Sequence, residues 1–306
     1  MGFLYALEAI RNPVLDKIMY FFTVLGQETV FLVLAIAVFW CVNKRQGYYM
    51  MTVGFVGIIL NQALKLIFRI PRPWVKDPNF TIVESARNGA TGYSFPSGHT
   101  QNAVNVFGTT AGWTDKKWLR WVCIGLIVLI SFSRMYLGVH TPADVITALV
   151  MGVVLTMAFY PFFKNDNGDP KKMLRLIGIM LIVAVAYVLF VELYKFPVDI
   201  DPDNLHEGIM NGYKLMGAVA GLLIAYIIDE KHTRFETSAP LWVQAVKLVV
   251  GFGLLMAVKE GLKAPLSALF SESVAACVRY FAIVLFAGAV WPLSFKPLSN
   301  LANKSK

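Results

Sequence analysis

Three short clusters of charged and histidine residues lie at the ends of long apolar runs. In chain order, the clusters are Lys65 with Arg72, Ser97-Gly98-His99, and Arg134 with His140 and Asp144. Charged residues at membrane depth are costly and are commonly functional. Arginine binds phosphate oxygens through paired hydrogen bonds, lysine acts on them as a point charge, and imidazole can transfer a proton or attack phosphorus. The clusters therefore predict a site that binds and cleaves a phosphate ester.

The spacing within the clusters predicts separate roles for the two histidines. Asp144 follows His140 by one helical turn, so its carboxylate can accept a hydrogen bond from one ring nitrogen and leave the other nitrogen free to attack. We therefore expect His140 to be the nucleophile, oriented by Asp144. His99 has no carboxylate partner nearby in the sequence and is expected to be the general acid that protonates the leaving oxygen.

The remaining cluster residues are expected to bind the phosphate. Ser97 and Gly98 begin a predicted helix, where free backbone N–H groups and the helix dipole favour an anion. Three cations would surround the same group and neutralise the charge that develops on it, so neither a metal ion nor a cofactor is predicted. The predicted phosphate-binding residues are Lys65, Arg72, Ser97, Gly98 and Arg134.

The composition indicates an integral membrane protein. Of the 306 residues, 57% are hydrophobic and 15% are charged, against about 45–50% and about 25% in soluble proteins. The net charge of +9 does not indicate nucleic-acid binding, because the basic residues lie in short clusters between apolar runs. We predict an all-α, polytopic transmembrane helical bundle with about nine spans: Glu28–Val42, Gly47–Phe68, Ser97–Trp113, Trp118–Ser133, Thr141–Phe163, Met173–Tyr194, Gly212–Ile228, Leu241–Val258 and Val274–Trp291.

The connectors between these spans predict an orientation. Lysine and arginine are concentrated in alternate connectors, such as those containing Lys44-Arg45 and Lys116-Lys117, which places these connectors in the cytoplasm. The three clusters then share the extracytoplasmic side. We expect an integral protein of the plasma membrane with its active site on that side.

Three further segments lead to expectations. Phe3–Leu25 carries charges at broken intervals and is expected to be an amphipathic helix at the membrane interface, with a hidden span as the alternative. The polar segment Lys164–Lys172 divides the chain into a phosphatase core, residues 1–165, with this helix and five spans, and residues 166–306, with four additional spans of unknown role. The acidic segment Asp199–Glu207 has Asn204 where a calcium-binding EF-hand needs glycine, so we expect a solvated acidic loop.

Three motifs resemble the signature of the type 2 phosphatidic acid phosphatase superfamily. The patterns K-x6-R-P, P-S-G-H and S-R-x5-H-x3-D are filled without substitution, and the resemblance covers about Gly47–Phe163. It implies a phosphohistidine intermediate on His140, with His99 as the acid, and phosphate binding by the five residues named above. The span number is similar to the layout of sphingosine-phosphate phosphatases and glucose-6-phosphatases. The last four spans lie outside the resemblance.

These observations predict a metal-independent membrane lipid phosphate phosphatase, whose partners are the bilayer and its lipid substrate. Phosphatidic acid, phosphatidylglycerol phosphate, a sphingoid phosphate or an isoprenyl diphosphate would each suit the site. The alternatives are a sugar-phosphate phosphatase, a lipid phosphotransferase and a non-catalytic phospholipid transporter. The transporter is disfavoured, because a binding site needs no oriented nucleophile such as His140 with Asp144. No oligomeric state is predicted.

Overall fold

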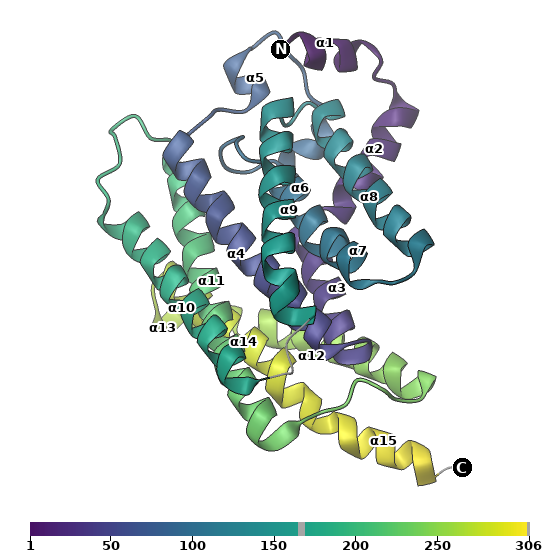
Figure 1. Cartoon of the computed structure of the whole chain (residues 1–306). Helices are drawn as coiled ribbons and strands as arrows, with labels where there is room; N and C mark the ends of the chain where they lie inside the picture. The colour runs from purple at the N-terminus through teal and green to yellow at the C-terminus, as the bar shows by residue number, and fades with distance from the viewer. Residues whose placement is uncertain (165–168, 305–306) are drawn as a thin grey trace. The chain divides into compact units, whose positions relative to one another are not determined.

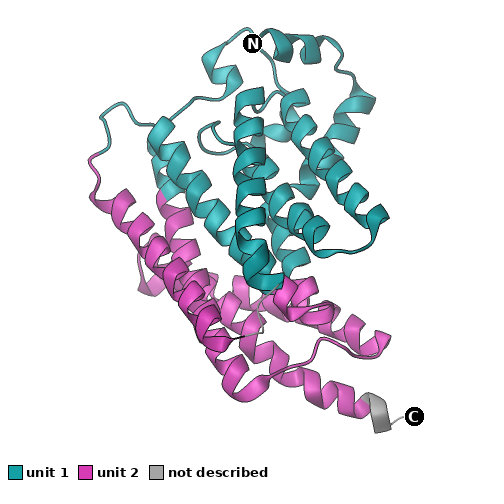
Figure 2. Cartoon of the chain, viewed as in Figure 1, with its two compact units in different colours: residues 1–35, 48–165, 196–208 teal, residues 36–47, 166–195, 209–306 magenta. Residues whose placement is uncertain are grey.

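The computed structural model describes residues 1–164 and 169–304, and within these ranges all regular elements are helices (Figure 1). The predicted all-α class is therefore confirmed. The chain forms two compact units that interleave along the sequence (Figure 2). Unit 1 contains residues 1–35, 48–165 and 196–208, and unit 2 contains residues 36–47, 166–195 and 209–306.

Unit 1 holds all three sequence clusters. Its elements are α1 (Gly2–Ala9), α2 (Pro13–Leu25), the first part of α3 (Glu28–Cys41), most of α4 (Lys44–Phe68), α5 (Pro73–Lys76), the 3₁₀ helix η1 (Glu84–Gly89), α6 (Gly98–Ala103), the π-helical turn η2 (Val104–Gly108), α7 (Thr109–Trp113), α8 (Lys117–Tyr136) and α9 (Pro142–Lys164). The run α6–η2–α7 packs against both α8 and α9, and α2 packs against α8.

Unit 2 is built from the long helices of the second half of the chain. Its elements are α10 (Pro170–Leu193), most of α11 (Pro202–Ile228), the π-helical turn η3 (Asp229–Thr233), α12 (Leu241–Gly261), α13 (Lys263–Leu269), α14 (Glu272–Leu285), the short turns η4 (Phe286–Val290) and η5 (Trp291–Ser294), and α15 (Phe295–Lys304). Helices α11 and α14 approach closely at Gly217 and Gly221. A Cβ atom at Gly217 would lie 2.0 Å from the carbonyl oxygen of Cys277, so this small-xxx-small pair sets the helix separation.

Among the described residues, seven helical segments are long and apolar enough to cross a membrane, or eight if the bent pair α2–α3 forms one span. The sequence predicted about nine. The prediction for Glu28–Val42 holds only together with α2. Ser97–Trp113 forms one continuous helical run, α6–η2–α7, which contains a π-helical turn and is shorter than the other spans. The hydroxyls of Thr109 and Thr110 donate to carbonyl groups one turn back in the helix, and such bonds compete with regular helical hydrogen bonding.

The N-terminal segment differs from the single interfacial helix that was expected over Phe3–Leu25. The first helix, α1, ends at Ala9, and the side chain of Asn12 accepts hydrogen bonds from Val14 N and Leu15 N, so it caps α2. Helix α2 continues into α3 through a 49° bend next to Gly26. A Cβ atom at Gly26 would lie 2.7 Å from Cγ2 of Ile130 and 3.0 Å from the carbonyl oxygen of His99. The absence of a side chain therefore lets the bend contact the start of α6.

This close approach predicts that Gly26→Ala destabilises unit 1. The added methyl group must displace its neighbours, and overpacking of this kind costs about 1–3 kcal/mol. We expect a fall in the melting temperature of the detergent-purified protein of about 2–4 °C for each kcal/mol. Gly125→Ala is the matched control, because a Cβ atom at Gly125 has no heavy atom within 4 Å. Equal melting temperatures for the two variants would contradict the prediction.

Candidate active site

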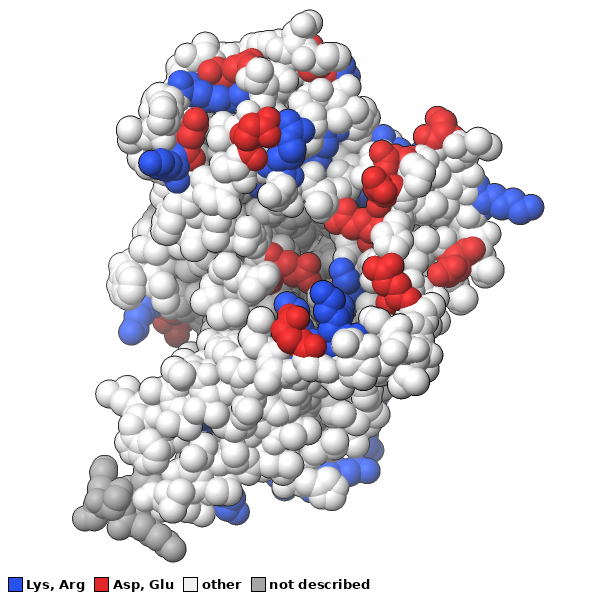
Figure 3. All heavy atoms as spheres, turned by 180° about the vertical axis from the view of Figure 1, so that it is seen from behind, with Lys and Arg blue, Asp and Glu red and all other residues white. Residues whose placement is uncertain are grey.

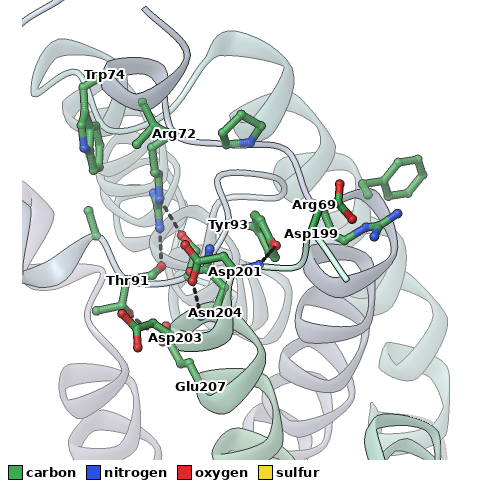
Figure 4. A pocket seen from close by; sticks show the side chains of 15 residues that line it. Arg69, Arg72, Trp74, Thr91, Tyr93, Asp199, Asp201, Asp203, Asn204 and Glu207 are labelled. Carbon is green, nitrogen blue, oxygen red and sulfur yellow. Dashed lines mark hydrogen bonds between the residues drawn. The ribbon is translucent and has the colours of Figure 1, made fainter. Parts of the chain in front are cut away.

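The loop Thr91–Tyr93 orients two of the predicted phosphate-binding cations through its carbonyl groups. Nζ of Lys65 donates to the carbonyl oxygen of Tyr93 at 2.7 Å. Nε of Arg72 donates to the carbonyl oxygen of Gly92 at 3.0 Å, and its Nη2 donates to that of Thr91 (Figure 4). Both cationic side chains are buried, so backbone oxygens take the place of water. These bonds fix the position of the two positive charges without neutralising them.

Arg72 and Asp144 lie at opposite nitrogens of the His140 ring. Nη1 of Arg72 is 2.9 Å from Nε2, and Oδ2 of Asp144 is 3.5 Å from Nδ1. A guanidinium group can only donate hydrogen bonds, so Nε2 carries the lone pair and Nδ1 carries the proton that faces the carboxylate. This is the tautomer that a nucleophilic His140 requires.

Asp144 is itself held by a reciprocal helix cap and by a serine. Its Oδ2 accepts from Thr141 N at 2.7 Å, and Asp144 N donates back to Oγ1 of Thr141 at 3.3 Å. This is a capping box at the start of α9, and Pro142 suits the first helical position. Ser94 Oγ donates to the same Oδ2 at 2.6 Å. The carboxylate is thus fixed in place before any ligand binds.

The surroundings of His140 keep its ring neutral. The ring is only 1% exposed. Burial first, and then the positive charges of Arg72, Arg134 and Lys65, lower the pKa of His140 well below its usual value. A neutral ring retains the Nε2 lone pair, so both burial and neighbouring charge favour the nucleophilic form.

Arg134 is buried with part of its guanidinium group unused. The side chain is 1% exposed, and its Nη1 donates to Oγ1 of Thr23 in α2. Its Nε and Nη2 have no hydrogen-bond partner among the described residues. A buried cation with free donors is costly unless an anion compensates it. Arg134 therefore fits the predicted role of a phosphate ligand.

The start of α6 supplies the last part of the site. Ser97 caps the helix, because its Oγ accepts from Thr100 N at 3.4 Å, and its own N–H donates to the carbonyl oxygen of Asp144. A Cβ atom at Gly98 would meet no heavy atom within 4 Å, so an anion could approach the backbone there. His99 lies within electrostatic range of Arg134 and His140.

The structure thus brings all eight predicted residues into one cluster at the ends of α4, α6, α8 and α9. Sequence reasoning missed several supporting groups. Thr23 comes from a segment expected to lie at the interface, Ser94 lies just before the P-S-G-H motif, and the carbonyl groups of Thr91–Tyr93 carry no side-chain signal. None of the three follows a local pattern that the cluster spacing could reveal.

A cavity of about 710 Å³ opens beside the Arg72 end of this cluster. Side chains of both charges gather around a hollow on the face shown in Figure 3. The cavity is lined on one side by Arg72, Trp74 and the loop Thr91–Tyr93, and on the other by residues of the acidic segment Asp199–Glu207 (Figure 4). We expected this segment to be a solvated loop. That expectation is wrong from Pro202 onward, because these residues form the first turns of α11. Within them the carboxylate of Glu207 accepts a hydrogen bond from Oγ1 of Thr91.

Comparison with known proteins agrees with this geometry. The model of the PAP2 superfamily matches residues 45–168, which include all three motifs. A second model, described as the transmembrane extension of PAP2 superfamily phosphatases, matches residues 213–304. The undecaprenyl-diphosphatase BcrC of Bacillus subtilis is 30% identical over 154 residues, which are 50% of this chain and 77% of that protein. The chain belongs to the PAP2 superfamily.

Other PAP2 relatives differ in the lipid that their names specify. Phosphatidylglycerophosphatase B of Bacillus subtilis is 31% identical over 53% of this chain and 79% of its own length. A probable sphingosine-1-phosphate phosphatase of Dictyostelium discoideum is 31% identical over 50% of this chain but only 39% of its own length. No solved structure matches the chain. Membership of the family makes the protein a membrane phosphatase.

The position of Ser94 predicts that Ser94→Ala lowers activity without unfolding the protein. The serine donates to the buried carboxylate of Asp144, and a hydrogen bond to a charged group contributes about 1.5–3 kcal/mol. We expect kcat/KM for phosphate release to fall by about tenfold or more. Ser131→Ala is the control, because Ser131 is also buried but its Oγ has no partner among the described residues. Equal activity of the two variants would show that Ser94 does not orient Asp144.

The charge around His140 predicts the acid side of the pH profile. Because nearby cations lower the pKa of His140, the ring stays neutral below the usual imidazole pKa of about 6.5. We expect kcat/KM, which reports the free enzyme, to fall only below pH 6.5. Arg134→Gln removes one cation, so the pKa should rise and this fall should move to higher pH. Both proteins are measured with the same substrate, so ionisation of the substrate affects both profiles equally. An acid limb at the same pH in both proteins would contradict its assignment to His140.

Proposed function

We propose that the protein hydrolyses the phosphate ester of a membrane lipid through a phosphohistidine intermediate on His140. One observation carries the proposal: the unprotonated Nε2 of His140 lies in a buried cluster with Lys65, Arg72 and Arg134. Such a cluster attracts a phosphoryl group and presents a nucleophile to it. The family membership supports the phosphatase reaction, and we assign its two steps to individual residues.

In the first step, Nε2 of His140 attacks phosphorus and the bond from phosphorus to the ester oxygen breaks. His99 gives its proton to this oxygen, so a lipid monophosphate leaves as a neutral alcohol and an isoprenyl diphosphate leaves as the isoprenyl monophosphate. Asp144 stabilises the positive charge that develops on the His140 ring. In the second step, His99 takes a proton from water, the water oxygen attacks phosphorus, and the N–P bond breaks to release inorganic phosphate.

Lys65, Arg72 and Arg134 would bind the phosphoryl oxygens, together with the backbone at Ser97 and Gly98. Arg72 would turn from Nε2 of His140 towards the phosphate when a ligand enters. Since the loop carbonyls already hold Lys65 and Arg72, little reorganisation is needed during the reaction. This preorganisation is the usual source of electrostatic catalysis.

The lipid class is inferred from the membrane setting and the relatives. The names of the relatives specify an isoprenyl diphosphate, a glycerophospholipid and a sphingoid phosphate. We propose a substrate from this group or phosphatidic acid, hydrolysed at the extracytoplasmic face of the plasma membrane. We also propose that residues 1–165 form the catalytic core and that the helices within residues 166–306, apart from the first turns of α11, have a separate role.

The proposal predicts that detergent-purified protein releases phosphate from lipid phosphates and that His140→Ala reduces this rate by at least about a thousandfold. The panel contains phosphatidic acid, phosphatidylglycerol phosphate, a sphingoid phosphate, an isoprenyl diphosphate and glucose 6-phosphate. Lipids should be turned over faster than the sugar phosphate. Full turnover by His140→Ala would refute the nucleophile, and a preference for the sugar phosphate would refute the lipid class.

The role of His99 as the acid can be tested by comparing substrates with poor and good leaving groups. His99→Ala should slow lipid phosphate cleavage strongly, because an alkoxide leaves poorly without a proton. With 4-nitrophenyl phosphate the leaving group needs no acid, so the first step should persist and phosphohistidine should accumulate. An equal loss of the first step with both substrates would contradict the assignment of His99 as the acid.

A further inference from the structure

The segment 196–208 joins unit 1, although the chain on both sides of it belongs to unit 2. It also lies outside both family matches, which cover residues 45–168 and 213–304. The part of the chain that contacts the site here is therefore outside the residues that the two family models match.

The segment binds both ends of the loop Thr91–Tyr93. Oε1 of Glu207 accepts a hydrogen bond from Oγ1 of Thr91 at 2.6 Å. At the other end of the loop, the backbone N–H of Asp201 donates to the hydroxyl of Tyr93 at 3.2 Å. Asp201 in turn accepts from Asn204 N at 3.0 Å and so caps the start of α11, which holds the segment in shape.

The loop that is bound in this way is the one whose carbonyl groups orient Lys65 and Arg72. Between its ends lies Gly92 with φ +68°, a backbone conformation that suits glycine. A Cβ atom at Gly92 would lie 3.1 Å from Oε2 of Glu207 and 3.3 Å from Nζ of Lys65. Glu207 and Lys65 therefore approach the same turn, and the carboxylate lies within electrostatic range of Lys65 and Arg72.

We propose that Glu207 is a positioning residue of the phosphate site. Its hydrogen bond to Thr91 holds the loop in the conformation in which the loop carbonyls orient Lys65 and Arg72. Glu207 does not contact the reacting atoms and acts through the loop. The inference rests on the proposed function only in naming phosphate as the ligand of the two cations.

A double-mutant cycle tests the hydrogen bond between Glu207 and Thr91, because two residues that act through one bond have coupled effects on kcat/KM. Glu207→Ala and Thr91→Val should each lower kcat/KM for phosphate release by about tenfold, and the double variant should lose no more than either single one. Glu207→Gln keeps an oxygen acceptor for the threonine hydroxyl, so it should restore activity to within about twofold of the wild type. Additive losses, or a Gln variant as poor as the Ala variant, would overturn the proposal.

The variant Asp203→Ala distinguishes an effect of loop positioning on kcat/KM from an effect of the negative charge in the cavity. Asp203 lines the same cavity and its replacement removes the same charge, but the described contacts of the loop do not include it. The loss of kcat/KM should be clearly smaller than for Glu207→Ala. Equal losses would show that the negative charge of the cavity matters and that positioning of the loop does not.

Binding of inorganic phosphate distinguishes this proposal from the proposed function. Titration calorimetry of the purified full chain should show about tenfold weaker phosphate binding in Glu207→Ala and little change in Glu207→Gln. This readout needs no turnover, so it can succeed or fail whether or not any lipid in the panel is hydrolysed. Melting temperatures confirm folding, and Thr91→Ala, which also removes the hydroxyl, replaces Thr91→Val if the valine variant is unfolded. Unchanged phosphate binding in a folded Glu207→Ala protein would overturn the proposal.

Discussion

The active site depends on one constraint, which is the burial of three positive charges in a membrane protein. Lys65, Arg72 and Arg134 are each less than 10% exposed, and the buried carboxylate in their cluster, Asp144, is directed at His140. Removing such charges from water is costly unless polar groups or an anion compensate them. The loop carbonyls compensate two of the cations in part, and the free donors of Arg134 remain for an anion. This incomplete compensation is the physical basis of the proposed affinity for phosphate.

The cations are held by groups that lie far apart along the chain. Thr23 from α2 contacts Arg134, the loop Thr91–Tyr93 contacts Lys65 and Arg72, and Glu207 from the start of α11 contacts that loop. Each contact fixes a donor or acceptor that could otherwise rotate freely. The phosphate site is therefore a product of the whole of unit 1, including segments that the family model does not cover.

Unit 2 shows a different use of buried charge. Lys44 pairs with the buried carboxylate of Asp229 at 2.7 Å and lies 3.8 Å from the ring centroid of Phe235. Lys247, also buried, donates to the carbonyl oxygens of Glu236 and Thr237. These cations are compensated by a carboxylate or by carbonyl groups and the face of a ring. They therefore stabilise the unit, in contrast to the partly compensated cations of the phosphate site.

The sequence by itself determined the chemistry and the class of fold. Hydrophobic runs identified the helices, since only helices and closed barrels satisfy backbone groups in lipid, and motif spacing identified residues that the structure places together. Local patterns also fixed the helix start at Thr141, because capping is decided within four residues. The bend at Gly26 and the support from Thr23, Ser94 and Glu207 were decided only by the tertiary structure. These features arise from contacts between segments up to 116 residues apart, and a one-dimensional pattern does not record which distant side chains will meet.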